Sequence, residues 1–425
     1  MDFLSQASRH RIRTICLQAK KFHPIWGIAT LSMVLVIGSL FYYHQTWGTV
    51  ANFVVALDHC DVLFCDFTKQ YYPTGQQLFE SATPTDGYFY SLFFAIFLAF
   101  LGKLSLETAV LIWTLFQVVT AVLLFILPAY TFWSYSRRAY FLYLVLLLLA
   151  VPILHNFKWG QISTFVTASV LATYYFYSKE RKFLAAIPLA LATAAKFYPA
   201  LFLIYFLFKK EWRFTLFYLL IVAIFVILVP LAVLGLDNNL HFYQIVNERI
   251  AHARSSWVLT DINSQYLANV AGRLTSNQDN RVLWQIIGYG LTALGLAQVY
   301  RIAQTTKPIS ILWAFALLFL LTPFFVETSW PHYFVYLPFC QVLVFLQLEK
   351  EPRKSLAWFI AALLLALSML LLSLFFFNLI SDWKIYSRYG ILFWANLLVL
   401  LSAISLSGIS PLPTRHSPLP QPIDG

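Results

Sequence analysis

Residues 108–133, TAVLIWTLFQVVTAVLLFILPAYTFW, form a long apolar run without a charged side chain. A helix of this length exceeds the roughly 20 residues that cross the hydrocarbon core of a bilayer. The chain holds further apolar runs on both sides, at 25–43, 88–102, 140–156, 162–178, 183–208, 212–234, 282–303, 309–322, 333–348, 357–380 and 389–407. The pattern predicts an all-α polytopic membrane protein with about 10–12 transmembrane segments.

The composition agrees with this class. Of the 425 residues, 60% are hydrophobic and only 11% are charged, whereas soluble domains carry roughly 45–50% apolar and about 25% charged residues. So few charges cannot cover a polar surface, which excludes an ordinary cytosolic domain. The formal net charge of +11 is expected to reflect basic cytoplasmic loops, and no nucleic-acid partner is expected.

Two of the apolar runs do not fit simple spans. Run 88–102 is short, and run 183–208 has Lys196 in its middle, followed shortly by Pro199. A charge and a proline at that depth predict a helical hairpin or a broken helix beside a polar cavity. If 88–102 lies along the outer interface and 183–208 folds back, more Lys and Arg residues face the cytoplasm than if both segments span. The positive-inside rule therefore favours this first topology.

The favoured topology divides the chain into three parts. A basic cytoplasmic N-terminus (1–24) precedes a polytopic membrane domain (25–408), and a Pro-rich, disordered cytoplasmic tail (409–425) follows. The first apolar run is expected to remain as an uncleaved signal-anchor in the cell inner membrane. The loops predicted to face the external, periplasmic side are 44–87, 235–281, 323–332 and 381–388.

The outer loop 44–87 contains the acidic residues best suited to chemistry. Asp66 opens the run Asp66-Phe67-Thr68-Lys69-Gln70-Tyr71-Tyr72. A carboxylate followed by interfacial aromatic residues can bind an amphipathic substrate and act as a general base. Asp61, in the same loop, is the alternative base. The other acids of the loop are expected to be solvated: Asp58, Glu80 and Asp86.

The four cysteines show no spacing typical of a metal site. Cys60 and Cys65 share the outer loop, where they form a disulfide if the compartment is oxidising and otherwise stay as two thiols. The sequence leaves both states open.

Further polar residues interrupt apolar runs on the same predicted side. Lys158-Trp159-Gly160-Gln161 separates two runs, and Ser329-Trp330-Pro331-His332-Tyr333 lies in a later outer loop. Lys196 either snorkels to water or pairs with a phosphate or with a carboxylate such as Glu327. His332 is either a structural or a catalytic residue. An acid, a lysine, a glutamine and a histidine at membrane boundaries are suited to deprotonating a hydroxyl while a phosphate leaves.

Taken in order, these motifs resemble the polytopic C-fold glycosyltransferases. The resemblance is specifically to the polyprenyl-phosphate-mannose-dependent family of the phosphatidylinositol-mannoside α-1,2-mannosyltransferase type. It extends over about residues 60–335 and rests on Asp66 and Phe67 with Tyr71 and Tyr72, on Gly160 and Gln161, on Lys196 to Pro199, and on Ser329 to Tyr333. The chain departs from the family pattern at Tyr90-Ser91, where a proline is common, and by one extra residue between the acid and the tyrosine pair.

The resemblance implies an inverting transfer of a hexose, with mannose expected, from a polyprenyl-phosphate donor to a lipid or glycan acceptor in glycolipid biosynthesis. No nucleotide, cofactor or metal is implied. Asp66 would be the catalytic base and His332 a second catalytic residue, and the run 88–102 would be an interfacial helix. The substrate-binding residues expected are Tyr71, Tyr72, Lys158, Gln161, Lys196, Tyr198 and Trp330.

Elementary chemistry supports such a reaction and leaves two other classes open. Positive charge would stabilise a departing phosphate, either at Lys196 or on the outer loops. A transporter or lipid flippase would use the same intramembrane lysine and acids for ion coupling, although no internal repeat is evident. A glycan polymerase or ligase would favour an Arg-rich outer loop such as 235–281. The outer-loop cations in question are Lys158, Arg249, Arg254 and Arg273.

Overall fold

The computed structural model describes residues 57–58, 60, 62–258, 260–275, 280–305, 309–350 and 355–407. The predicted N-terminal segment, the first span 25–43 and the tail 409–425 lie outside this part. Its regular elements are all helices, so the predicted all-α class is confirmed. In chain order they are η1 (Phe67–Tyr71), α3 (Tyr72–Ser81), α4 (Leu92–Gly102), α5 (Leu106–Tyr135), α6 (Arg137–Leu149), α7 (Val151–Trp159), α8 (Ser163–Tyr177), α9 (Lys182–Ala195), η2 (Tyr198–Phe202), α10 (Leu203–Phe208), α11 (Trp212–Ala223), η3 (Ile224–Leu228), α12 (Val229–Ala253), η4 (Arg254–Val258), α13 (Leu267–Thr275), α14 (Arg281–Ala303), α15 (Ser310–Phe325), η5 (Pro331–Tyr336), α16 (Leu337–Lys350), α17 (Leu356–Leu372), α18 (Leu374–Ile380), α19 (Trp383–Arg388) and α20 (Ile391–Ser407).

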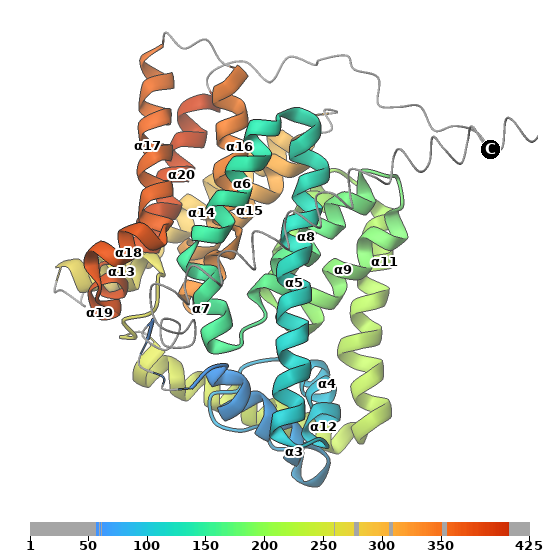
Figure 1. Cartoon of the computed structure of the whole chain (residues 1–425). Coiled ribbons are helices and arrows are strands. Elements are labelled where there is room, and N and C mark those ends of the chain that lie inside the picture. The colour runs from blue at the N-terminus through green and yellow to red at the C-terminus, as the bar shows by residue number, and fades with distance from the viewer. Residues whose placement is uncertain are drawn as a thin grey trace, which may run out of the picture.

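Four stretches of the described helices are long and apolar enough to cross a membrane. They are Leu106–Trp133, Trp212–Val258, Arg281–Ala303 and Pro331–Lys350. Shorter apolar helices, among them α15, α17 and α20, pack beside them (Figure 1). Large apolar side chains are exposed on the outer helices, for example Leu111 at 70% and Leu115 at 63% on α5. Such exposure is expected of side chains that face lipid. The polytopic membrane class is therefore confirmed, while the number of ten to twelve spans stays a prediction.

The predicted outer loops gather at one end of the helix bundle. We call this end the outer end, after the predicted topology. In Figure 1, α3, α4 and α12 lie at the bottom of the molecule, and α13 and α19 lie on the left, below α17. Polar contacts join the loops, between Arg249 and Asp86 at 3.1 Å, between Arg254 and Glu327 at 2.7 Å, and between Trp383 and Asn263 at 2.8 Å. The described parts of the four loops therefore share one end of the molecule, as the predicted topology requires.

Run 183–208 folds back as a hairpin, which confirms that prediction. α9 ends at Ala195 because Lys196 is extended, with φ −143° and ψ 120°. Pro199 has no N–H to donate to the carbonyl four residues earlier, which disfavours an α-helix that continues through it. The chain then returns through η2 and α10, and the two ends of the hairpin meet where Lys182 Nζ lies 2.8 Å from Glu211 Oε2.

Two other predicted spans are broken rather than continuous. Run 140–156 is interrupted at Ala150, between α6 and α7, and run 357–380 is interrupted at Ser373, between α17 and α18. The two breaks face each other and form an isolated antiparallel bridge. At each break the backbone N–H donates to the helix before it, from Ala150 to the Leu147 carbonyl at 3.4 Å and from Ser373 to the Leu370 carbonyl at 3.0 Å.

Helices η1, α3 and α4 form a small unit at the outer end. Its aromatic core includes Tyr71, Tyr88, Phe94 and Trp113. α4 spans about 16 Å at 1.5 Å per residue, which is too short to cross a bilayer, and it packs against α3 and α12. Figure 1 shows this unit beside the lower end of α5. The arrangement supports the interfacial interpretation of run 88–102.

A glycine turns α12 out of the bundle. Gly235 adopts φ 75° and ψ 175° within the helix, a conformation that side-chain-bearing residues rarely accept. The segment after this kink runs across the outer end beside α3 and α4 (Figure 1). Arg249 on this segment pairs with Asp86, and this contact helps to close the outer end.

Cysteine labelling tests which end of the molecule faces outward. With Cys16 and Cys340 replaced by serine and the outer-loop disulfide retained, we expect Glu80→Cys to react with an impermeant maleimide in intact cells. Arg138→Cys, exposed at the basic end of α6, should react only after lysis, because basic loops stay in the cytoplasm. External reaction of Arg138→Cys would contradict the topology.

Candidate active site

A cavity of 460 Å³ lies at the outer end, where η1, the α7–α8 turn, the α9–η2 break and η5 meet. Its volume lies within the range of small-molecule binding sites. Six of the predicted site residues line it: Asp66, Gln161, Lys196, Tyr198, Trp330 and His332. Segments that are far apart in the sequence are thus brought to one place. The roles of the six residues in binding and catalysis stay predictions.

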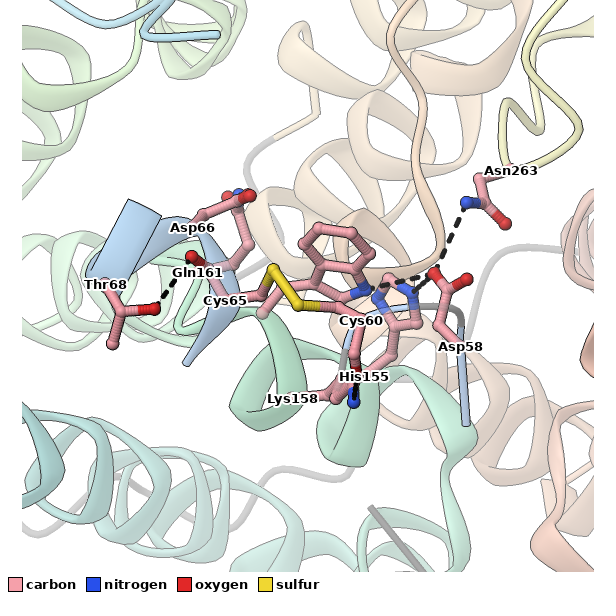
Figure 2. The surroundings of a disulfide bond; sticks show 10 residues. Asp58, Cys60, Cys65, Asp66, Thr68, His155, Lys158, Gln161 and Asn263 are labelled. Atoms are coloured by element: carbon pink, nitrogen blue, oxygen red, sulfur yellow. Dashed lines mark hydrogen bonds and ion pairs between the residues drawn. A yellow bond between two sulfur atoms is a disulfide. The ribbon is translucent and has the colours of Figure 1, made fainter. Parts of the chain in front are cut away.

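Asp66 is positioned by a loop that a disulfide closes. Cys60 and Cys65 are bonded, with five residues of sequence separation, directly before Asp66. Thr68 Oγ1 donates a hydrogen bond to the Cys65 carbonyl at 3.1 Å. Figure 2 shows Asp66 facing Gln161 next to the disulfide. The bond restricts the backbone from which the Asp66 carboxylate projects.

The Gly160 turn brings Gln161 against this loop. Gly160 ends α7 with φ 65°, in the left-handed region. A Cβ atom built there would lie 3.0 Å from the Cβ atoms of both Phe64 and Phe67. Only glycine therefore permits both the backbone angle and the close approach. The approach places Gln161 next to Asp66.

Gln161 is held by buried amides and reaches Asp66 with its side chain. Its backbone N–H donates to Asn156 at 2.9 Å, and its carbonyl accepts from Gln117 Nε2 at 2.7 Å. The side-chain Nε2 donates to Asp66 Oδ2, while the side-chain oxygen accepts from the Tyr90 hydroxyl. The glutamine thus connects the carboxylate to the interior of the protein.

Lys196 projects from the helix break into the cavity among aromatic residues. Its Nζ donates to the Tyr90 hydroxyl at 3.3 Å and lies 3.9 Å from the centre of the Tyr333 ring. Cation–π contact of this kind stabilises a desolvated ammonium. Glu327, suggested as a partner from the sequence, pairs instead with Arg254. The ammonium therefore faces the cavity with phenol and ring neighbours.

His332 is buried at the back of the cavity in a column of stacked rings. Its ring lies 5.6 Å from that of His155, which in turn stacks on Trp383 at 4.7 Å. Neither ring nitrogen of His332 has a hydrogen-bond partner within the described part of the chain. A buried imidazole of this kind has unused capacity for a substrate hydroxyl or phosphate.

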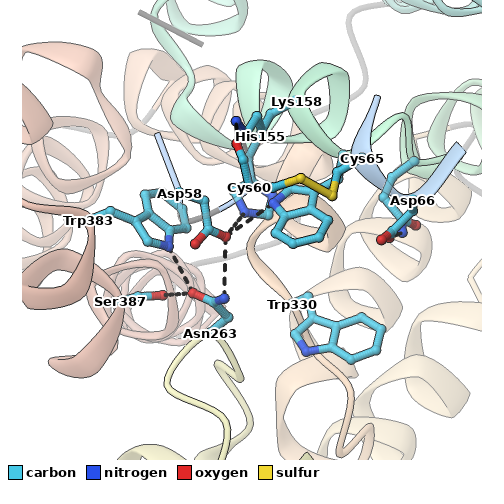
Figure 3. A network of polar contacts seen from close by, with 12 residues as sticks. Asp58, Cys60, Cys65, Asp66, His155, Lys158, Asn263, Trp330, Trp383 and Ser387 are labelled. Carbon is cyan, nitrogen blue, oxygen red and sulfur yellow. Dashed lines mark hydrogen bonds and ion pairs between the residues drawn. A yellow bond between two sulfur atoms is a disulfide. The ribbon is translucent and has the colours of Figure 1, made fainter. Parts of the chain in front are cut away.

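Asp58 anchors this column and is not solvated, so that expectation was wrong. The residue is 8% exposed, and its Oδ2 accepts from Trp159 Nε1 at 3.1 Å and lies 3.4 Å from His155 Nε2. Asn263 donates to the same oxygen at 3.3 Å and accepts from Trp383 (Figure 3). A buried carboxylate requires such donors, and here they join three outer loops. By contrast, Glu80 and Asp86 are exposed, as expected.

A second carboxylate, Asp261, also lines the cavity. Burial raises the pKa of the Asp261 carboxyl, against the opposing effect of hydrogen bonds from the Asn263 backbone and from Trp330. Trp330 Nε1 donates to Asp261 Oδ2 at 2.8 Å, and its ring lies parallel to that of Trp257, 6.4 Å away. The two indoles form one aromatic wall of the cavity.

Three predicted substrate-binding residues do not line the cavity: Tyr71, Tyr72 and Lys158. Tyr71 is fully buried behind Tyr90, to which its hydroxyl donates at 2.7 Å, and Tyr72 donates to the Leu104 carbonyl at 2.7 Å. The outer-loop cations are likewise engaged elsewhere: Lys158 with the Cys60 carbonyl, Arg249 with Asp86, Arg254 with Glu327, and Arg273 with the carbonyls of Asp261 and Ser264. These residues hold the loops in place, and Lys196 is the predicted cation that faces the cavity.

Sequence reasoning missed several cavity residues. Tyr90 was noted only as a departure from a family pattern, and His155 sits inside a run assigned as a plain span. The signal available for His155 was its position four residues before Trp159, one helical turn from the Gly-Gln motif. Asp61, the alternative base, lies outside the described residues. No group of three or more metal-ligating side chains occurs in the described part, and the expectation of a metal-free reaction stays a prediction.

Replacing Gly160 tests the importance of the turn. Gly160→Ala should lower the free energy of unfolding by at least about 1–2 kcal/mol, because the left-handed backbone becomes strained and the new Cβ contacts Phe64 and Phe67. Thermal unfolding in detergent measures the effect. The matched control is Gly272→Ala in α13, where a Cβ meets no atom within 4 Å. Equal stability of the two variants would contradict a strained turn.

Comparison with known proteins gives one family. The model of glycosyltransferase family 87 matches residues 88–324, more than half of the chain. The matched segment contains Gln161 and Lys196, while Asp66 precedes it and His332 follows it. No curated protein and no solved structure matches the chain. The chain therefore belongs to glycosyltransferase family 87 and is a membrane glycosyltransferase.

Proposed function

We propose that the protein transfers a hexose, with mannose as the first candidate, from a polyprenyl-phosphate donor to a lipid or glycan acceptor. The transfer takes place at the outer face of the cell membrane and inverts the anomeric configuration. The observation that carries the proposal is that Asp66 and Lys196 line one cavity at the end of the bundle opposite the basic loops. Mannose rests on the motif resemblance alone.

The reaction needs a base, and Asp66 is suited to this role. The acceptor hydroxyl attacks the anomeric carbon and loses its proton to the Asp66 carboxylate. The new glycosidic C–O bond forms as the bond between the anomeric carbon and the phosphate oxygen breaks, and that electron pair leaves with polyprenyl phosphate. The bond from Gln161 to Asp66 holds the carboxylate in its charged form before the attack.

The leaving phosphate needs a cation, and Lys196 is suited to provide it. The ammonium lies in a desolvated site, where its interaction with a phosphate is stronger than in water. His332 lies next to Tyr333, whose ring contacts that ammonium. His332 is a second group that can orient the sugar or the phosphate through hydrogen bonds.

The lipid part of the donor requires an apolar approach to the cavity. Two of the cavity-lining side chains are apolar and strongly exposed, Phe197 at 51% and Trp257 at 41%. Phe197 follows Lys196 directly at the break in the membrane hairpin. A polyprenyl chain lying in the outer leaflet can therefore contact Phe197 and Trp257 while its phosphate group lies near Lys196.

Transfer assays with an Asp66 variant test the base. With polyprenyl-phosphate mannose and a panel of glycolipid acceptors in proteoliposomes, Asp66→Asn should lower the transfer rate at least about 10²-fold. The product of the wild type should carry the anomeric configuration opposite to that of the donor. Glu80→Gln is the matched control, because Glu80 lies in the same predicted outer loop with an exposed side chain.

The rival carboxylates are tested in the same assay. Near-normal transfer by Asp66→Asn, together with a large loss in Asp61→Asn or Asp261→Asn, would move the base to that residue. Absence of transfer by the wild type with every prenyl-phosphate sugar offered would refute the donor class.

Donor-induced stabilisation tests Lys196. Lys196→Met should fold and lose little or no thermal stability, because it removes a cation whose insertion into a membrane is costly. Polyprenyl-phosphate mannose at about 100 times its dissociation constant should stabilise the wild type by about 2.7 kcal/mol, and it should hardly change the unfolding temperature of the variant. Lys103→Met, at an exposed outer lysine, should respond like the wild type. Equal stabilisation of all three proteins would exclude a phosphate role for Lys196.

A further inference from the structure

A continuous chain of hydrogen bonds joins Lys196 to Asp66. Lys196 Nζ donates to the Tyr90 hydroxyl at 3.3 Å, Tyr90 donates to Gln161 Oε1, and Gln161 Nε2 donates to Asp66 Oδ2. Tyr90, Gln161 and Lys196 are each less than 9% exposed. The proposed cation and the proposed base are therefore connected through two neutral side chains inside the protein.

The donors at Tyr90 determine the direction of the chain. An ammonium can only donate hydrogen bonds, and the Tyr71 hydroxyl also donates to the Tyr90 oxygen, at 2.7 Å. The one proton of Tyr90 is thus directed to the oxygen of Gln161. The side-chain amide of Gln161 then has its NH₂ group toward Asp66.

We propose that Tyr90 is a positioning residue that fixes the amide orientation of Gln161, so that Asp66 is held as the charged base. The inference rests on the proposed function, in which Asp66 accepts the acceptor proton. It assigns a role to the residue at which the chain departs from the family pattern. Tyr90 also lines the cavity, but the proposed action passes through Gln161.

The physical reason is that a carboxylate can only accept hydrogen bonds, whereas a protonated carboxyl can also donate one. With Tyr90 present, the NH₂ of Gln161 favours the carboxylate. Without the Tyr90 hydroxyl, the amide can turn its oxygen toward Asp66, and this arrangement favours the protonated acid. The loss of one hydrogen bond to the charged carboxylate corresponds to a shift of about one pH unit in the protonation of Asp66.

Other titratable groups also face Asp66, and their effects on the pH dependence must be distinguished from its own. Lys196, Tyr71 and Tyr90 interact with it electrostatically. Across the cavity, further groups line the wall: His155, Asp261 and His332. A change in pH dependence is therefore assigned to Asp66 only if it disappears in Asp66→Asn.

The first test is the pH profile of the transfer rate. Tyr90→Phe should move the acidic limb of the kcat profile about one unit to higher pH and leave much of the rate at the alkaline plateau. Tyr88→Phe is the matched control, because Tyr88 is equally buried two residues away and donates to the Ser91 carbonyl, outside the chain. Its acidic limb should stay at the wild-type position. A uniform loss of rate at every pH in Tyr90→Phe would overturn the proposal.

A double-mutant cycle tests whether Tyr90 acts through Gln161. Gln161→Met should shift the limb in the same direction, and the variant Tyr90→Phe/Gln161→Met should shift it no further than Gln161→Met alone. Residues that act in one chain give such non-additive effects. Additive shifts would show that Tyr90 acts independently of Gln161, against the proposal.

Infrared titration provides a measurement that does not depend on transfer. The carboxyl stretch that is lost in Asp66→Asn reports the protonation of Asp66. It should appear at a pH about one unit higher in Tyr90→Phe than in the wild type and in Tyr88→Phe. If no prenyl-phosphate sugar is transferred, this result still supports or refutes the role of Tyr90, so failure of the inference and failure of the function can be told apart.

Discussion

Lys196 places a positive charge within an apolar run, and the surrounding helices and loops are arranged to accommodate it. An ammonium and a broken backbone are tolerated at membrane depth only beside a polar cavity or a protein interior. The chain meets this requirement by folding run 183–208 back on itself and by lining the break with Tyr90, Tyr198 and Tyr333. The cavity exists because the hairpin stops at Lys196.

The outer loops complete this cavity through mutual polar contacts. Asp58 is the buried junction, since His155, Trp159 and Asn263 converge on one of its oxygens (Figure 3). Buried carboxylates are costly unless such donors surround them. The same donors also order the stacked rings that end at His332. These contacts fix the loops over the cavity, so the loops are packed parts of the structure rather than solvated connections.

The sequence supported the membrane class, the hairpin and six cavity residues for simple reasons. Apolar length and the depth of a charge are local properties, and motifs at membrane boundaries tend to gather on one side. It failed where burial is decided by distant partners. Asp58 looked like a loop acid because its donors come from α7 and from the loop near Asn263. Tyr71 looked like a ligand because the covering ring of Tyr90 lies outside the motif.

The pattern of residues was enough to predict that this chain crosses a membrane as helices, because hydrophobic length and charge placement act without reference to the fold. Which polar groups meet follows from the folded arrangement of the helices and cannot be read from the sequence. Packing brings distant segments together where Tyr90 and Asp66 both contact Gln161. It does the same where Glu327 pairs with Arg254. Hydrogen bonds and ion pairs depend on distances of a few ångströms, which residue spacing along the chain does not specify.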